Sequence, residues 1–207
     1  HMTTLSQSEL YGDGFGKPLT LSVDALQERV KHRRPTETPE MFQRIFQGSM
    51  PALASGAITK RNLFYSSYIA TYIERDIRQL SGTIDAVEFL RFLTAVACRA
   101  GQMVNYADIG NDMDSMRSEK VQEWLGLLEK SDIIFYLHPY SNNLLKRTVT
   151  KPKLYFYDTG LVAYLTKWTS AETLEAGAMN GAILENYTVA EIVKTYLNAG
   201  EEPNLFY

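Results

Sequence analysis

The sequence predicts a mainly helical protein whose middle part is a winged helix, that is, a helix-turn-helix followed by a β-hairpin. Apolar residues recur with the period of an α-helix over residues 85–100, 106–113 and 114–130. Two short runs rich in aromatic and β-branched residues follow, at 133–137 and 153–157. Because 45% of the 207 residues are hydrophobic, the chain can bury a substantial core around these elements.

The first part of the chain, residues 3–82, is predicted to be a loop-rich start followed by helices. Two short helices are expected over 22–31 and 39–47, the first with Ser22 as its N-cap. A longer helix is expected over 60–80, because apolar residues recur there at steps of three and four: Leu63, Phe64, Tyr68, Ile69, Tyr72, Ile73, Ile77 and Leu80. Residues 1–2 resemble the remnant of a cleaved purification tag and are left out of the argument.

The middle part, residues 83–157, contains the predicted winged helix. Gly101 ends its first helix, Asn105 can cap the second, and Asp114 or Ser115 can cap the third. The second and third helices are thus separated by a tight turn, as a helix-turn-helix requires. The inward-facing residues of the third helix are expected to be Val121, Trp124, Leu125 and Leu128.

The last part, residues 158–207, is predicted to be helical over 158–165 and 178–197. It ends in an apolar, aromatic run, Pro203-Asn-Leu-Phe-Tyr207, which resembles the start of a strand without a partner. We therefore expect the natural protein to continue past Tyr207 and to begin before Thr3.

Composition and charge restrict the function classes. The net charge of −3 argues against a globally basic nucleic-acid binder but leaves room for a local basic face. Cys98 is the only cysteine and lies in an apolar run, so we expect a buried structural thiol and a reducing, cytoplasmic setting. No apolar run approaches the roughly 20 residues that span a bilayer, which predicts no membrane segment.

A glycine cluster near the N-terminus, Tyr11-Gly-Asp-Gly-Phe-Gly-Lys17, invites comparison with a phosphate-binding loop. Such a loop needs a glycine where Tyr11 stands and a serine or threonine where Pro18 stands. No hydrophobic strand precedes the cluster either. The segment is therefore interpreted as a connector.

The third helix of the predicted winged helix would face nucleic acid. Its first turn carries Arg117, Ser118 and Lys120, which are residue types that contact phosphates and base edges. Glu119 and Glu123 on the same helix would repel phosphates. The helix alone does not decide between nucleic-acid contact and another role.

The hairpin strengthens the case for nucleic acid. No acidic residue occurs from Ile133 to Tyr157, while tyrosines alternate with the basic residues His138, Lys146, Arg147, Lys151 and Lys153. A basic hairpin flanked by aromatic residues suits contact with a phosphate backbone, in DNA or in RNA. The alternative is a hairpin that packs on an acidic neighbouring domain.

Two carboxylate groups elsewhere have competing interpretations. Glu185 lies in the apolar stretch Gly181-Ala-Ile-Leu-Glu-Asn186 and is either a helix-surface residue or one member of a metal-binding set. The charge cluster Glu74-Arg75-Asp76 is typical of a solvated helix face, although Arg75 or Arg78 could reach a nucleotide or a neighbouring subunit.

Five blocks in order resemble the C-terminal half of a group of prokaryotic AAA+ family ATPases. They are Tyr72-Ile-Glu-Arg-Asp-Ile77, Phe89-Leu-Arg-Phe-Leu93, Glu123-Trp-Leu-Gly-Leu-Leu-Glu-Lys-Ser131, Lys151-Pro-Lys-Leu-Tyr-Phe-Tyr-Asp-Thr-Gly-Leu161 and Gly181-Ala-Ile-Leu-Glu-Asn186. These ATPases carry a C-terminal domain of unknown function, in which a winged helix is followed by a restriction-endonuclease-like fold. The resemblance covers nearly the whole chain. Its lysine-proline-lysine block and its Glu185 block are the most specific parts.

The resemblance implies a division of the chain into a lid-like helical segment and connector at 3–82, a winged helix at 83–157 and the start of a truncated endonuclease-like α/β domain at 158–207. Gly48-Ser-Met-Pro51 departs from the usual Gly-Gly-Phe-Pro of the lid end. The ATPase core would precede Thr3, so ATP and magnesium are expected only for the full-length protein. Glu185 matches the first acidic position of the endonuclease-like part, whose other metal ligands would lie beyond Tyr207.

Three functions follow as hypotheses. The chain is a non-catalytic piece of an ATPase whose winged helix contacts nucleic acid through the third helix and the hairpin. Alternatively, the winged helix docks on the missing ATPase core or another subunit, with a homo-oligomer possible. As a further alternative, the full-length protein is an ATP-dependent nuclease with Glu185 as one metal ligand.

Overall fold

The computed structural model describes residues 4–12, 17–72, 85–140 and 151–207. Short helices α1, α2, α3 and α4 (Gln7–Tyr11, Val23–Lys31, Thr38–Gln47 and Pro51–Ala54) lead to α5 (Arg61–Tyr72). Helices α7, α8 and α9 (Ala86–Ala97, Tyr106–Asp112 and Ser118–Lys130) precede strands β1 (Ile134–Leu137) and β2 (Lys153–Phe156). The chain then continues through α11 (Thr159–Leu165), α12 (Ala171–Glu175) and α13 (Asn180–Asn198). The predicted mainly helical fold with one antiparallel hairpin is confirmed in the described residues.

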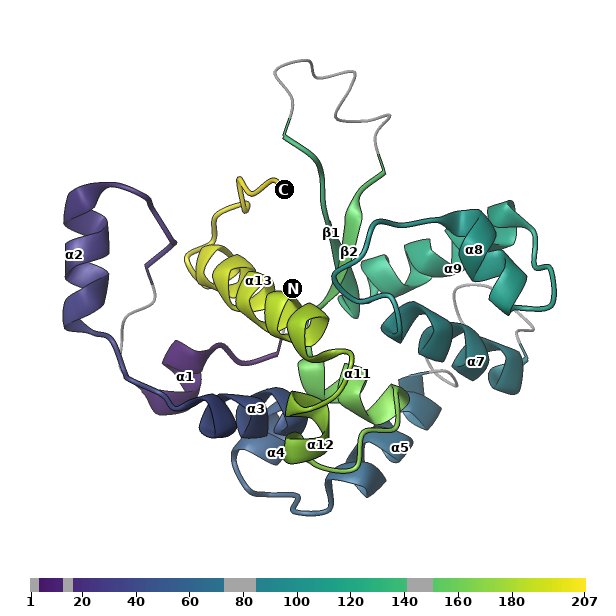
Figure 1. The fold of residues 1–207 in the computed structure, drawn as a ribbon, viewed down its shortest axis with the longest axis horizontal. Coiled ribbons are helices and arrows are strands. Elements are labelled where there is room, and N and C mark those ends of the chain that lie inside the picture. The colour runs from purple at the N-terminus through teal and green to yellow at the C-terminus, as the bar shows by residue number, and fades with distance from the viewer. Residues whose placement is uncertain (1–3, 13–16, 73–84, 141–150) are drawn as a thin grey trace.

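Helices α7, α8 and α9 pack on one side of the hairpin, to the right in Figure 1. Their shared core is aromatic, because the Trp124 ring lies 5.1 Å from the rings of both Phe89 and Phe92. The loop between α7 and α8 also pairs with the hairpin, through an antiparallel bridge from Met103 to Lys153 and a 2.8 Å hydrogen bond from the Gly101 amide to the Leu154 carbonyl. The three helices and the hairpin therefore form one connected unit.

The hairpin separates two groups of buried side chains. Ile134 pairs with Phe156 and Phe135 with Tyr155, so the alternation of a strand places Ile134, Leu154 and Phe156 in the main core. Phe135, Leu137 and Tyr155 face the other way and pack with Ala190 and Val193 of α13. The main core also takes residues from α3, α4 and α5 and from α11 and α12, which lie together in the lower part of Figure 1.

Several local predictions differ from the structure. Arg117, and not Asp114 or Ser115, occupies the N-cap of α9. Asp114 and Ser115 instead have φ angles of 53° and 66°, so they form the left-handed turn between the helices. Asn105 does hold the N-cap position of α8, although its side chain makes no capping bond. The predicted cap Ser22 is confirmed, and Asp85, at the predicted start of the first winged-helix helix, caps α7 with its side chain.

Cys98 is exposed, which corrects the expectation of a buried thiol. The inward stripe of α7 consists of Phe89, Phe92, Leu93, Val96 and Ala97. Cys98 follows as the C-cap, one step beyond Ala97, and this step turns it about 100° away from the stripe. An apolar neighbourhood in the sequence therefore did not imply burial.

The predicted helix over 60–80 is described only as far as Tyr72. The cluster Glu74-Arg75-Asp76 lies outside the described residues. The C-terminal run, which the sequence predicted as the start of a strand without a partner, forms a parallel bridge from Phe206 to His138, just beyond β1. Of the helices that the structure describes, none combines the length and the apolar character needed to cross a membrane.

Candidate functional site

The face of the hairpin toward α13 brings together Lys153, which the sequence predicted to contact nucleic acid, and Glu185, which it predicted to bind a metal ion. Because Lys153 and Tyr155 are two residues apart on β2, both side chains point toward α13. The Glu185 carboxylate accepts a hydrogen bond of 2.7 Å from the Lys153 ammonium and another of 2.7 Å from the Tyr155 hydroxyl. Lys153, a predicted nucleic-acid contact, is thus paired with Glu185, a predicted metal ligand.

The pairing affects how these groups titrate. Burial raises the pKa of Glu185, but the hydrogen bonds from Lys153 and Tyr155 and the lysine charge outweigh it, so the pKa is lowered. Burial and the bond to Glu185 raise the pKa of Tyr155, which keeps its hydroxyl protonated as a donor. Among the described residues, no group of three or more histidines, cysteines or carboxylates is placed to hold a metal ion. Here the Glu185 carboxylate has a lysine and a tyrosine as its partners.

Asn186 fixes α13 to the same strand. Its side chain is fully buried, accepts a 2.8 Å bond from the Phe156 amide and donates a 2.8 Å bond to the Phe156 carbonyl. These two bonds satisfy both backbone groups of Phe156. Glu185 and Asn186 therefore together hold the hairpin against α13.

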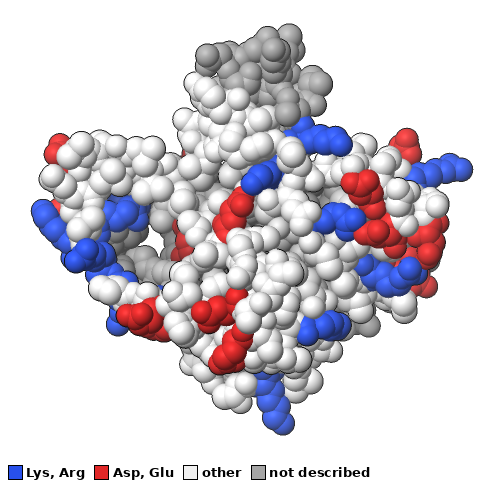
Figure 2. All heavy atoms as spheres, viewed as in Figure 1, with Lys and Arg blue, Asp and Glu red and all other residues white. Residues whose placement is uncertain are grey.

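The start of α9 carries charges of both signs. Arg117 and Ser118 stand at its first turn, and the Lys120 ammonium pairs with Glu88 of α7 at 2.9 Å while lying 4.5 Å from the Trp124 ring centre. Two more ion pairs join basic and acidic side chains on this unit, Arg91 with Asp114 and Arg99 with Asp112. Figure 2 shows blue and red side chains interspersed over this right-hand side of the molecule. Over residues 85–130 the chain has eight acidic and five basic side chains, so this unit carries a net negative charge.

The far end of the hairpin has a different character. Lys151 is exposed, and the ring of Tyr140, which is 65% exposed, lies beside Phe206. The backbones of His138 and Tyr140 bond to Tyr207. Lys146 and Arg147, the other two predicted contacts, lie outside the described residues. In Figure 2, basic side chains lie directly below the grey tip.

A buried polar cluster below the hairpin joins the N-terminal helices to the rest. This Asp158 cluster consists of Ser49, Tyr65, Asp158 and Lys194. One Asp158 oxygen accepts bonds of 2.7 Å from the Tyr65 hydroxyl and the Leu161 amide, and the other accepts a 2.7 Å bond from the Ser49 amide. Burial and the nearby Asp158 raise the pKa of Tyr65 well above its ordinary value, so Tyr65 stays a donor.

Lys194 closes this cluster from α13. Its side chain is 2% exposed, and its ammonium donates to the Ser49 hydroxyl, the Leu5 carbonyl and the Glu191 carboxylate at 3.0–3.1 Å. A buried lysine is stable only when its charge and its donors are paired, and here all three donors are used. The sequence analysis missed Asp158 and Lys194. A lysine on the apolar face of a long helix was the available signal for Lys194.

Replacing Glu185 with glutamine is expected to lower the free energy of unfolding at neutral pH by about 0.5–1 kcal/mol, because the partly exposed ion pair is lost. A lowered pKa stabilises the fold above the unfolded value, and this contribution disappears as the pH falls through the folded value. The difference between wild type and variant should therefore shrink on acidification below the ordinary value of 4.5.

Urea unfolding at neutral and acidic pH measures this difference, and Glu123→Gln, an exposed site on α9, is the matched control. A Glu185→Gln variant that matches wild type at neutral pH would show that the pair contributes nothing.

Comparison with known proteins finds one family model that matches residues 38–172, described as "Domain of unknown function (DUF8612)". Uncharacterized proteins of Mycobacterium tuberculosis and Mycobacterium bovis are each 30% identical over 125 residues. The match covers 60% of this chain but only 28% of either relative. No solved structure matches the chain significantly.

Proposed function

This chain belongs to the family described as Domain of unknown function (DUF8612), and we propose that it is a non-catalytic accessory part of an ATPase. In this proposal it contacts nucleic acid through a winged helix. The observation that carries this proposal is the hairpin, which has no acidic residue from Ile133 to Tyr157. The ATPase itself, with ATP and magnesium, follows only from the resemblance to AAA+ proteins, and the cytoplasmic setting is inferred from the single cysteine. The ATPase belongs to the full-length protein.

The arrangement of the middle unit supports the winged-helix interpretation. Helices α7, α8 and α9 and the hairpin follow in the order that a winged helix requires, and α9 stands where the recognition helix would be. The bridge between Met103 and Lys153 adds the segment after the first helix to the hairpin as a short third strand. The β2 edge of the hairpin thereby has a further neighbour, and the bridge from Phe206 to His138 gives the β1 side one as well.

Within this unit, the hairpin is the better candidate for phosphate contact. At the start of α9, Lys120 already pairs with Glu88. Arg91 of α7 pairs with Asp114 in the turn before α9, and Arg99, just after α7, pairs with Asp112 at the end of α8. Phosphate binding there would have to compete with these carboxylates. At the exposed end of the hairpin, just before β2, Lys151 has no acidic residue near it in the sequence of the hairpin. Hairpin carboxylates would therefore not compete with phosphates for it.

Reversing the charge of Lys151 is expected to weaken binding of short duplex DNA or RNA several-fold and to reduce the dependence of log affinity on log salt by about one unit, because one phosphate contact is lost. Lys151→Glu is compared with Lys60→Glu, which makes the same charge change at an exposed site between α4 and α5, at the opposite end of the molecule. Fluorescence anisotropy at low and physiological salt measures both quantities.

A stronger test combines Lys146→Glu with Arg147→Glu, where the loss should be larger. Equal loss of affinity in Lys60→Glu and Lys151→Glu would mean that only net charge matters. Absence of salt-dependent binding by the wild type would reject the proposal.

Two other functions rest on specific features. The balanced ion pairs of α7 to α9 favour a docking surface for the ATPase core or another subunit, including a second copy, because protein surfaces complement mixed charge. Co-migration with the separately produced ATPase core on a sizing column would support it. The nuclease alternative requires Glu185 to bind metal, and unchanged cleavage by full-length Glu185→Gln would remove Glu185 from such a mechanism.

A further inference from the structure

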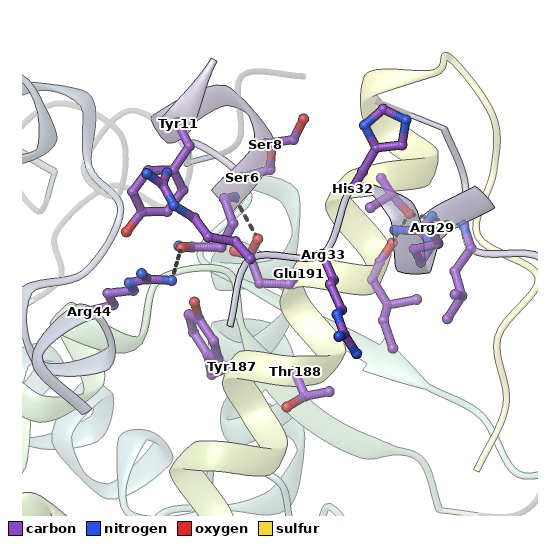
Figure 3. A pocket seen from close by; sticks show the side chains of 15 residues that line it. Ser6, Ser8, Tyr11, Arg29, His32, Arg33, Arg44, Tyr187, Thr188 and Glu191 are labelled. Carbon is purple, nitrogen blue, oxygen red and sulfur yellow. Dashed lines mark hydrogen bonds between the residues drawn. The ribbon is translucent and has the colours of Figure 1, made fainter. Parts of the chain in front are cut away.

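A pocket on the far side of α13 from the hairpin is rich in arginine. It has a volume of about 420 Å³ and lies between α1, the end of α2, α3 and α13. We call it the arginine pocket, and Figure 3 shows the side chains that line it. Its basic lining residues are Arg29, His32, Arg33, Arg34 and Arg44. Neither the comparisons nor the proposed winged-helix function assigns it a role.

Among the described residues that line the pocket, acids are few, although Glu40 pairs with Arg44 and Glu28 with His32 from outside the lining. Glu191 is the acidic residue among its lining. Both oxygens of the Glu191 carboxylate are engaged, one with the Lys194 ammonium at 3.0 Å and the other with the Gln7 amide at 2.7 Å. Its charge is therefore matched by Lys194 and contributes little toward neutralising the four arginines.

The arginines are drawn together around one aromatic ring. The guanidinium of Arg34 lies 4.1 Å from the centre of the Tyr11 ring, and that of Arg44 lies 4.6 Å from the same centre. Arg44 also pairs with Glu40 and reaches the Gln7 side chain at 3.2 Å, yet its buried Nε has no hydrogen-bond partner in the described structure. The negative face of the Tyr11 ring attracts both guanidinium groups and holds them at the same side of the pocket.

Arg33 is the arginine with the most freedom to bind. Its side chain is exposed, and none of the hydrogen bonds or ion pairs of the described residues involves it. Figure 3 shows Arg33 extending along α13 toward Thr188, with Tyr187 between it and Arg44 in this view. Burial and Glu191 raise the pKa of Tyr187, so its hydroxyl stays protonated and can donate a hydrogen bond, whereas the Thr188 hydroxyl already donates to the Leu184 carbonyl at 2.9 Å.

From this geometry we propose that the arginine pocket binds a small ligand that carries two or more phosphate groups, of the size of a nucleoside diphosphate. The arginine fork matches phosphate oxygens in pairs, and the Tyr187 hydroxyl in the wall of the pocket supplies a further donor. The volume lies in the range of small-molecule sites, whereas a nucleic-acid strand needs an extended groove. The site is separate from the hairpin, so it does not depend on the proposed nucleic-acid contact.

Isothermal titration of the chain with pyrophosphate, and separately with ADP, at physiological salt tests the proposal. One-to-one binding is expected, and Arg33→Ala should weaken it about tenfold or more by removing a charge-assisted bond. Lys31→Ala is the matched control, because Lys31 is exposed, pairs with Glu28 and does not line the pocket. Lys31→Ala should change the affinity less than twofold. The ratio of the pyrophosphate and ADP affinities tells whether the ligand is recognised by its phosphates alone.

Three outcomes would overturn the proposal. They are no binding of either probe at millimolar concentration, equal losses in Arg33→Ala and Lys31→Ala, and tighter binding of a single-stranded oligonucleotide that Arg33→Ala abolishes. The last would make the pocket part of a nucleic-acid path. Lys151→Glu should leave pyrophosphate binding unchanged, so failure of the hairpin proposal and failure of this one remain distinguishable.

Discussion

Replacing Gly160 with alanine is expected to lower the free energy of unfolding by about 3 kcal/mol or more, because the added methyl group has no space. A Cβ at this position would come within 2.7 Å of both the Gln47 carbonyl oxygen and the Gly48 Cα, and within 2.2 Å of the Tyr65 hydroxyl. The first two atoms belong to the backbone of another segment and cannot rotate away. The Tyr65 hydroxyl is held by Asp158. Urea unfolding followed by circular dichroism measures the change.

Gly126→Ala is the matched control for this substitution. Gly126 lies inside α9, and a Cβ there meets no atom within 4 Å. Alanine should therefore stabilise the protein by up to about 1 kcal/mol through its helix propensity. A Gly160→Ala variant as stable as Gly126→Ala would show that the segments around Gly48 and Gly160 are not packed as closely as described.

Replacing Asp158 with alanine is expected to cost about 3–5 kcal/mol, because several buried donors lose their acceptor at once. The amides of Ser49 and Leu161 would be left without a partner, and α11 would lose its N-cap. Lys194 would remain buried next to Ser49, and the Asp158 carboxylate on the other side of Ser49 would be gone. The midpoint of urea unfolding should fall accordingly, and the N-terminal helices should become accessible to protease first.

Tyr65→Phe separates the loss of the tyrosine hydrogen bond from the loss of the two backbone-amide hydrogen bonds. It removes one donor to Asp158 but keeps the ring and leaves the two amide bonds in place, so a smaller loss of about 1–2 kcal/mol is expected. If Asp158→Ala is no more destabilising than Tyr65→Phe, the carboxylate does not organise the cluster.

Local patterns in the sequence predicted most of the secondary structure. The helical period of α7 and the N-cap of α2 at Ser22 are properties of neighbouring residues, so they were predictable without the fold. The four-residue helix α4, which begins at Pro51, was not predicted. Pro51 suits a first helical turn as well as a break, and which of the two occurs depends on how Leu53 reaches the core.

The candidate sites were predictable only in part, because they depend on which distant residues meet. Lys153 and Glu185 each looked like a ligand-binding residue when taken alone, and the fold uses them to neutralise each other. The arginine pocket was not predicted. Its arginines come from the end of α2 and from α3, and only the packing of both against α13 turns scattered charges into one cavity.

The Asp158 cluster also has a consequence for how the protein is made. Its bonds join residues that are 109 and 145 positions apart, and Lys194 reaches the Leu5 carbonyl across 189 positions. Contacts of such high sequence separation form late, because a long loop has to be closed first. During synthesis, the unit of α7 to β2 can assemble from local contacts before Lys194 is available to bond to Leu5 and Ser49 in the N-terminal part. Until the ribosome has released α13, the N-terminal helices remain without their partner and open to chaperones and proteases.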